Sequence, residues 1–149
     1  MKPKPRLSLE ERALAYLTRR EYSRAELRQK LLSHAEDEGL VDSLLDKLTA
    51  RGALSDTRYV DQLLFARQAK FGRMKISYEL RQKGIATPLI EEALQKLCAT
   101  ERERALAVWR RKFGTLPVDA EDRARQIRFM QARGFELDVI LDLMRSIKN

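Results

Sequence analysis

The sequence predicts an all-α protein made of three tandem three-helix repeats, which together are expected to form an elongated, curved helical-repeat molecule. Apolar residues recur at intervals of three and four, whereas alternating runs of Val, Ile and Thr are missing. The 6 glycines and 4 prolines stand between these patterned segments. The chain also resembles itself at offsets of about 50 residues. These features favour stacked helical units over a fold that contains a sheet.

A basic arm, residues 1–7, precedes the first repeat, which spans residues 8–54. Ser8 and Ser23 each stand three residues before a glutamate, which is the spacing of a helix capping box. Each serine is therefore expected to begin a helix, and a third helix is expected to follow Gly39.

The second and third repeats, residues 56–98 and 100–149, are predicted from internal similarity. The letters Glu-Leu-Arg-Gln-Lys at 26–30 recur unchanged at 79–83. The last helix of each repeat shows the same apolar pattern, and a single irregular bundle with chance similarity is the alternative. The side chains expected in the repeat cores are Leu27, Leu44, Phe65, Leu80, Ile90, Leu94, Trp109, Phe113, Phe129, Val139 and Ile140.

Positive charge is spread along the whole chain. There are 30 Lys and Arg residues against 22 Asp and Glu, so the formal net charge is +8 and the isoelectric point is near 9.9. Such a balance favours a polyanionic partner, with a solvated helix face as the alternative. The densest stretch runs from residue 67 to residue 83. The residues expected to contact DNA or a protein–DNA filament are Arg67, Lys70, Arg73, Lys75, Arg81 and Lys83, with Arg110, Arg111, Arg24 and Arg28 in support.

The composition argues against several classes of enzyme. One Cys and one His exclude an internal disulfide, a multi-thiolate zinc site and any site that needs two imidazoles of this chain. We expect Cys98 to be a buried, inert thiol and His34 to lie on the surface. The glycines are isolated, so no phosphate-binding loop is present. We therefore expect no catalytic residues, no cofactor and no metal.

Two further features bear on location and on how DNA is read. No stretch approaches the roughly 18 apolar residues of a membrane span, so we expect no membrane partner and a cytoplasmic protein. The sequence also lacks a distinctive recognition helix, which argues against sequence-specific DNA binding.

Three segments of the chain resemble the signature segments of the RecX family, the regulators of the bacterial recombinase RecA. They lie at residues 17–27, 72–85 and 129–135, and the middle one reads Gly-Arg-Met-Lys-Ile-Ser-Tyr-Glu-Leu-Arg-Gln-Lys-Gly-Ile. Their order and spacing, together with the three-repeat layout, carry the resemblance over nearly the whole chain.

The resemblance implies a non-catalytic inhibitor that binds in the groove of the RecA–DNA filament. Such a protein limits ATP hydrolysis, strand exchange and the coprotease activity of RecA, and its partners are the RecA filament and single- and double-stranded DNA. We expect it to act as a monomer. Two alternatives remain: an architectural helical-repeat protein that binds nucleic acid on its own, and a helical adaptor that binds only protein.

Overall fold

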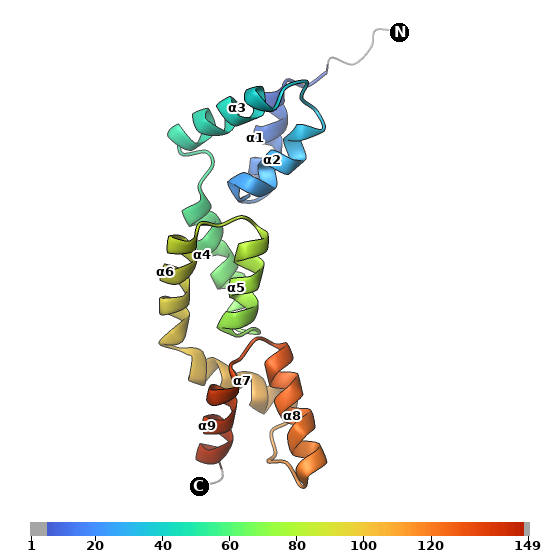
Figure 1. Ribbon diagram of the computed structural model, residues 1–149, viewed down its shortest axis with the longest axis vertical. Coiled ribbons are helices and arrows are strands. Elements are labelled where there is room, and N and C mark those ends of the chain that lie inside the picture. The colour runs from blue at the N-terminus through green and yellow to red at the C-terminus, as the bar shows by residue number, and fades with distance from the viewer. Residues whose placement is uncertain (1–5, 148–149) are drawn as a thin grey trace. The chain divides into compact units, whose positions relative to one another are not determined.

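The computed structural model describes residues 6–147 and contains nine helices and no strand within that range (Figure 1). The all-α repeat fold expected from the sequence is thereby confirmed. Most of the predicted basic arm, residues 1–5, lies outside the described residues. In chain order the helices are α1 (Leu9–Arg19), α2 (Arg24–Leu32), α3 (Glu38–Ala50), α4 (Asp56–Arg67), α5 (Arg73–Gln82), α6 (Thr87–Cys98), α7 (Glu101–Lys112), α8 (Ala120–Ala132) and α9 (Leu137–Ile147).

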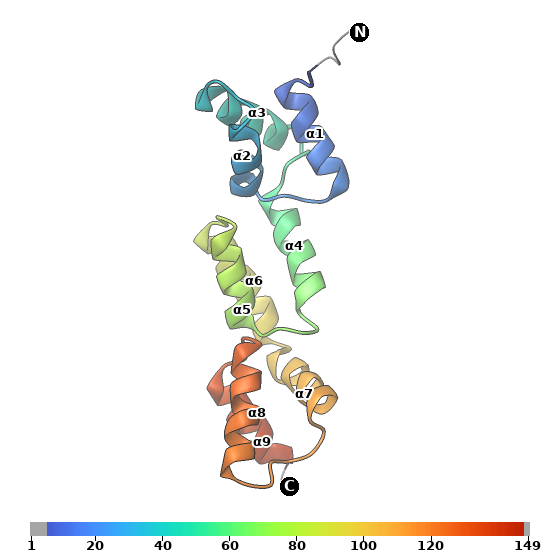
Figure 2. The same ribbon diagram turned by 90° about the vertical axis from the view of Figure 1, so that its right-hand side faces the viewer.

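The helices belong to two compact units. The first unit holds α1, α2, α3, the start of α4 up to Gln62, and the turn Lys83–Ile85. The second unit holds Leu63–Gln82 and the chain from Ala86 onward. Within the second unit, α5 and α6 lie side by side in both views (Figures 1 and 2). No helix of residues 6–147 is long and apolar enough to cross a membrane.

Each unit has its own apolar core. In the first unit, Leu27, Leu31, Val41, Leu45 and Leu48 are fully buried. In the second unit, the helices of the C-terminal part bury Trp109, Met130, Phe135, Ile140 and Leu143. Burial of such large apolar side chains supplies most of the stability of each unit.

The predicted helix starts are confirmed by their hydrogen bonds. The backbone N–H of Glu11 donates to the hydroxyl oxygen of Ser8, and the N–H of Glu26 donates to that of Ser23, both at 3.1 Å. The third helix begins slightly earlier than expected, at Glu38. The reason is that Asp37 caps it and accepts a hydrogen bond from the N–H of Gly39 at 2.8 Å.

Two predictions about burial were wrong. Phe65 is 83% exposed, because the preceding residues Leu63 and Leu64 occupy the buried face of α4. Cys98 is also exposed, because it is the last residue of α6 and follows the buried Leu97. Burial in the repeat cores is confirmed for Leu27, Leu44, Leu80, Ile90, Trp109 and Ile140, whereas Leu94, Phe113, Phe129 and Val139 are half-buried.

Both units contain a close contact between the start of a repeat's second helix and a glycine turn. In the first unit, the hydroxyl of Ser23 donates to the carbonyl of Lys83 at 2.8 Å, and a side chain at Gly84 would meet Ala25. In the second unit, the N–H of Gly72 donates to the carbonyl of Arg133 at 2.7 Å. We call these contacts the first and second turn contacts.

Candidate nucleic-acid interface

The ten basic residues predicted to contact DNA or the RecA filament are divided between the two units. The first unit holds Arg24, Arg28 and Lys83, and the second unit holds the other seven. The seven come from the end of α4, the α4–α5 turn, α5 and the last turn of α7.

Five of the ten residues are engaged with carboxylates of the protein itself. Each cation lies on or beside a helix whose neighbour presents an acidic side chain, so part of the positive charge is neutralised internally. The pairs are Arg24 with Asp46 (2.7 Å), Arg28 with Asp42 (2.9 Å), Arg67 with Glu79 (3.1 Å), Lys83 with Glu26 (3.3 Å) and Arg73 with Glu136.

The other five residues retain uncompensated charge. They are exposed, and none of them forms an ion pair with a carboxylate of residues 6–147. A polyanion that approaches them does not compete with an internal partner. All five lie in the second unit: Lys70, Lys75, Arg81, Arg110 and Arg111.

The structure brings together two cations that the sequence prediction did not include. Lys112 and Arg133 join Lys70 and Arg111 around a cavity of about 320 Å³, whose lining is completed by Val108 and Phe129. We call this the cationic pocket. The signal available in the sequence was the run of three basic residues at 110–112, but the sequence does not show that Arg133, which follows α8, lies beside it.

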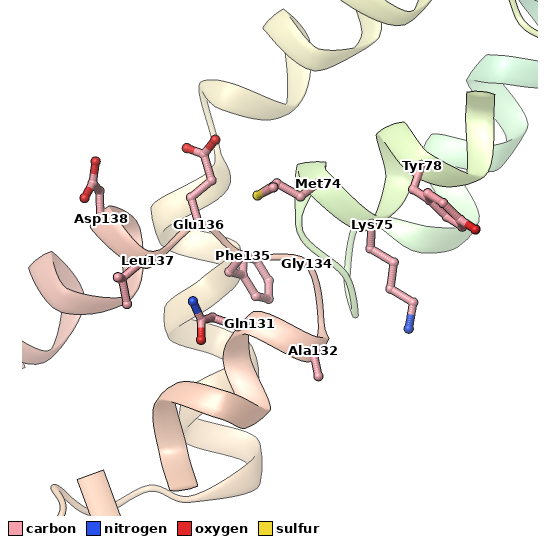
Figure 3. Close-up of a pocket in the computed structure, with 10 residues that line it drawn as sticks. All are labelled: Met74, Lys75, Tyr78, Gln131, Ala132, Gly134, Phe135, Glu136, Leu137 and Asp138. Atoms are coloured by element: carbon pink, nitrogen blue, oxygen red, sulfur yellow. The ribbon is translucent and has the colours of Figure 1, made fainter. Parts of the chain in front are cut away.

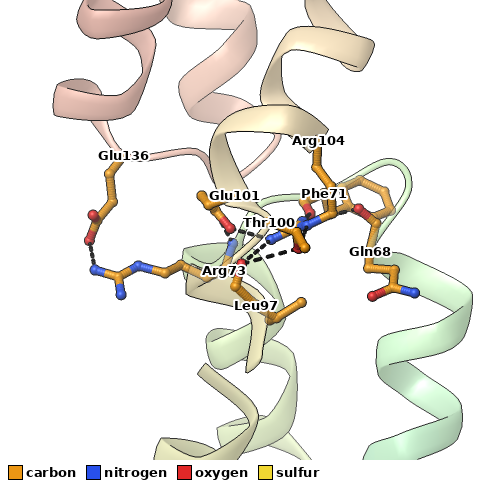
Figure 4. A network of polar contacts seen from close by, with 8 residues as sticks. All are labelled: Gln68, Phe71, Arg73, Leu97, Thr100, Glu101, Arg104 and Glu136. Carbon is orange, nitrogen blue, oxygen red and sulfur yellow. Dashed lines mark hydrogen bonds and ion pairs between the residues drawn. The ribbon is translucent and has the colours of Figure 1, made fainter. Parts of the chain in front are cut away.

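A buried ion pair fixes the α4–α5 turn that carries Lys70. The guanidinium of Arg104 bonds to the carboxylate of Glu101 and donates to the carbonyls of Gln68 (3.0 Å) and Phe71 (2.9 Å). Glu101 in turn accepts from the backbone N–H of Arg73 at 3.0 Å (Figure 4). Two carbonyls of the α4–α5 turn and an N–H at the start of α5 thereby gain hydrogen-bond partners.

A second hollow lies on α5 and the α8–α9 turn and has a volume of about 690 Å³ (Figure 3). Met74, Tyr78 and Leu137 contribute exposed apolar surface to it, with exposures of 56%, 60% and 43%. Lys75 and Asp138 also line it, so its charge is mixed. This groove differs from the cationic pocket, whose lining contains no carboxylate.

Glu26 lies beside the first turn contact and pairs with two cations. Burial tends to raise the pKa of Glu26, but hydrogen bonds from Arg20 (2.8 Å) and Lys83 (3.3 Å) outweigh burial, so its pKa lies below the ordinary value. In the second unit, the hydrogen bond to Glu136 raises the pKa of Arg73. Within residues 6–147, no cluster of His, Cys, Asp and Glu could hold a metal ion.

Sequence comparison connects the three groups of helices with one family. The models of the first, second and third three-helix domains of RecX match residues 11–48, 55–94 and 100–144, in that order. The regulatory protein RecX of Leptothrix cholodnii is 47% identical over 142 residues, which covers 95% of this chain and 90% of that protein. The regulatory protein RecX of Ralstonia nicotianae is 44% identical over 138 residues, covering 93% and 87%.

Solved structures show the same fold. The crystal structure of RecX from Lactobacillus salivarius superposes with a TM-score of 0.82 at 20% sequence identity, over 94% of each chain. The domain matches cover most of the sequence, and relatives above 40% identity match nearly end to end. The chain therefore belongs to the RecX family of regulatory proteins.

Proposed function

We propose that this protein is a non-catalytic regulator that inhibits RecA by binding in the groove of the RecA–DNA filament. Membership of the RecX family supports the regulatory role. The exposed cations of the second unit that lack carboxylate partners support contact with the DNA phosphates of the filament.

Steric exclusion explains how such binding inhibits without catalysis. A helical-repeat protein that occupies the groove stands where a second duplex or a repressor must enter, and this position limits strand exchange and coprotease activity. Contacts with successive recombinase subunits resist the changes that accompany ATP hydrolysis. Both effects need only binding energy, so no reacting group is required of the protein.

The alternative function is stand-alone binding of nucleic acid, and salt separates the two. Binding through phosphates alone weakens steeply as salt rises. We expect the protein to stay bound to preassembled RecA filaments at a salt concentration that abolishes its binding to free single-stranded DNA, measured by co-sedimentation and fluorescence anisotropy. Parallel loss of both interactions would favour the alternative.

Charge reversal tests the proposed DNA-facing surface. Lys75→Glu combined with Arg81→Glu should weaken inhibition of RecA at least tenfold, because both side chains are exposed and unpaired on α5. The matched control is Arg123→Glu with Arg128→Glu, which reverses two exposed charges on α8. Inhibition that survives the α5 change, or that falls equally in the control, would contradict the assignment.

A further inference from the structure

We propose that the cationic pocket is a binding site for the phosphate groups of a DNA strand and that it reads no base sequence. The pocket is lined by Lys70, Arg111, Lys112 and Arg133. The inference rests on the proposed function for its choice of DNA as the ligand, and it assigns that contact to one site in the second unit.

The pocket concentrates positive charge without a neutralising partner. No carboxylate lines it, and none of its four cations forms an ion pair within residues 6–147. Like charges that share a cavity repel one another, so an anion bound between them removes an unfavourable interaction as well as adding a favourable one. Arg133 is half-buried, whereas Lys70, Arg111 and Lys112 are exposed and can reach a ligand.

Aromatic rings contact two of the four cations. The guanidinium of Arg133 lies 5.2 Å from the ring centre of Phe129 and 5.3 Å from that of Phe71. The ammonium of Lys112 lies 5.2 Å from Phe129. Cation–π contacts orient a cation without cancelling its charge, in contrast to carboxylate partners. Two of the four cations of the pocket, Lys112 and Arg133, are therefore held by aromatic rings rather than by carboxylates.

The two turn contacts have matching geometry but differ in charge. Glu26 and Lys75 are each the third residue of their helices, α2 and α5, and Lys83 and Arg133 each precede a glycine with positive φ. In the first turn contact, Lys83 bonds to Glu26 at 3.3 Å. In the second, Lys75 stands at the acidic position, and it shares the ring of Phe71 with Arg133. The first turn contact thus has a carboxylate, Glu26, that neutralises its cation. The second turn contact, which lies beside the pocket, has Lys75 at the matching position.

The surroundings of Phe129 explain why the pocket reads no sequence. Phe113 packs perpendicular to its ring with the ring centres 5.4 Å apart, and the cationic groups of Lys112 and Arg133 lie 5.2 Å from its centre. A base that stacked on this ring would compete with these groups, which favours contacts with phosphate oxygens over contacts with bases.

The test measures binding of labelled 30-nucleotide single strands by fluorescence anisotropy. Arg111→Gln with Lys112→Gln should weaken binding at least tenfold at 100 mM salt. It should also reduce the slope of log affinity against log salt by about 1.4, because each lost phosphate contact contributes about 0.7. The control, Arg123→Gln with Arg128→Gln, removes the same charge from exposed positions outside the pocket and should cost less than threefold.

Equal losses in the two double variants would overturn the proposal, and so would a wild-type preference of more than threefold between two strands of unrelated sequence. ATP is added in a separate arm at the same concentration of phosphate groups. Displacement of DNA by ATP as efficient as by unlabelled strand would assign the pocket to free nucleotides and overturn the assignment to DNA.

Parallel RecA ATPase assays separate this proposal from the proposed function. A wild-type protein that inhibits RecA but binds no DNA would overturn the pocket and leave the regulator in place. The opposite result is a wild-type protein that does not inhibit RecA, together with a pocket variant that selectively loses DNA binding. It would support the pocket as a DNA site and overturn the proposed regulation of RecA.

Discussion

Arg104 and Glu101 carry opposite charges in the most enclosed ion pair of the described residues, with side chains 12% and 5% exposed. Removing a charge from water is costly, and Arg104 offsets that cost by donating to three backbone carbonyls, those of Gln68, Phe71 and Leu97. Loss of Arg104 leaves the carboxylate of Glu101 buried without its partner and removes the side-chain donor to the carbonyls of Gln68 and Phe71.

Arg104→Ala should therefore lower the free energy of unfolding by about 3–5 kcal/mol. Urea denaturation followed by circular dichroism measures the effect. The control is Arg102→Ala, whose side chain is 56% exposed and pairs with the equally exposed Asp142, so its loss should cost less than about 1 kcal/mol. Similar losses in the two variants would show that the network does not hold the α4–α5 turn.

The lowered pKa of Glu26 predicts how the stability of the protein changes in acid. Its pKa is lowered in the folded protein, so its pairing stabilises the fold at pH values above the ordinary glutamate pKa of 4.5. This stability is lost as the pH falls through the lower, folded-state pKa. The melting temperature of the wild type should decline below about pH 4.5, and Glu26→Gln should flatten that decline while lowering stability at neutral pH by about 1 kcal/mol.

Glu121→Gln is the matched change at an exposed glutamate without an ion pair in the described chain, and it should keep the acid response of the wild type. Thermal melts between pH 3 and pH 7 make the comparison. An unchanged decline in the Glu26 variant would show that the first turn contact contributes no acid sensitivity.

At the scale of elements, the two turn contacts show how successive repeats are connected. Each places the start of a second helix against a turn in which glycine has positive φ, at Gly84 (72°) and Gly134 (93°). In the second contact the backbones approach so closely that a side chain at Gly134 would lie 2.6 Å from the backbone nitrogen of Lys75. Two constraints therefore act on that residue, one conformational and one steric.

Gly134→Ala should lower the free energy of unfolding by about 3 kcal/mol or more, since it adds a backbone clash to the roughly 1–2 kcal/mol cost of left-handed backbone. Gly52→Ala is the control, because Gly52 also has positive φ (77°) but nothing lies within 4 Å of the added carbon. It should show only the smaller cost in the same urea titration. Equal losses of unfolding free energy in the two variants would mean that the close backbone contact at Gly134 does not contribute to stability.

The elements themselves were predictable from the sequence, whereas their charge pairing was not. Capping serines and the periodic leucines act within one helix, and the structure confirms Ser8, Ser23 and Leu27 in their expected roles. The division of cations into paired and unpaired groups depends on residues far apart in sequence, such as Arg73 and Glu136. Phe65 was misassigned because three consecutive apolar residues fit the buried face equally well by periodicity.

At the scale of the whole molecule, the cations behind the net charge of +8 differ in whether an acidic side chain neutralises them. Of the ten cations singled out from the sequence, the three in the first unit are paired with acids, whereas five of the seven in the second unit are exposed and unpaired, and the second unit also holds the cationic pocket. The second unit is therefore the part expected to face DNA in the filament, and regulation of RecA is the function that joins this surface to the RecX family.

The rate of DNA-dependent ATP hydrolysis by RecA, measured as the purified protein is titrated in, tests that claim most directly. Excess single-stranded DNA is added as a control for simple competition. We predict inhibition at substoichiometric protein that persists when the extra DNA is present. Absence of inhibition, or inhibition abolished by the extra DNA, would contradict a regulator that acts on the filament.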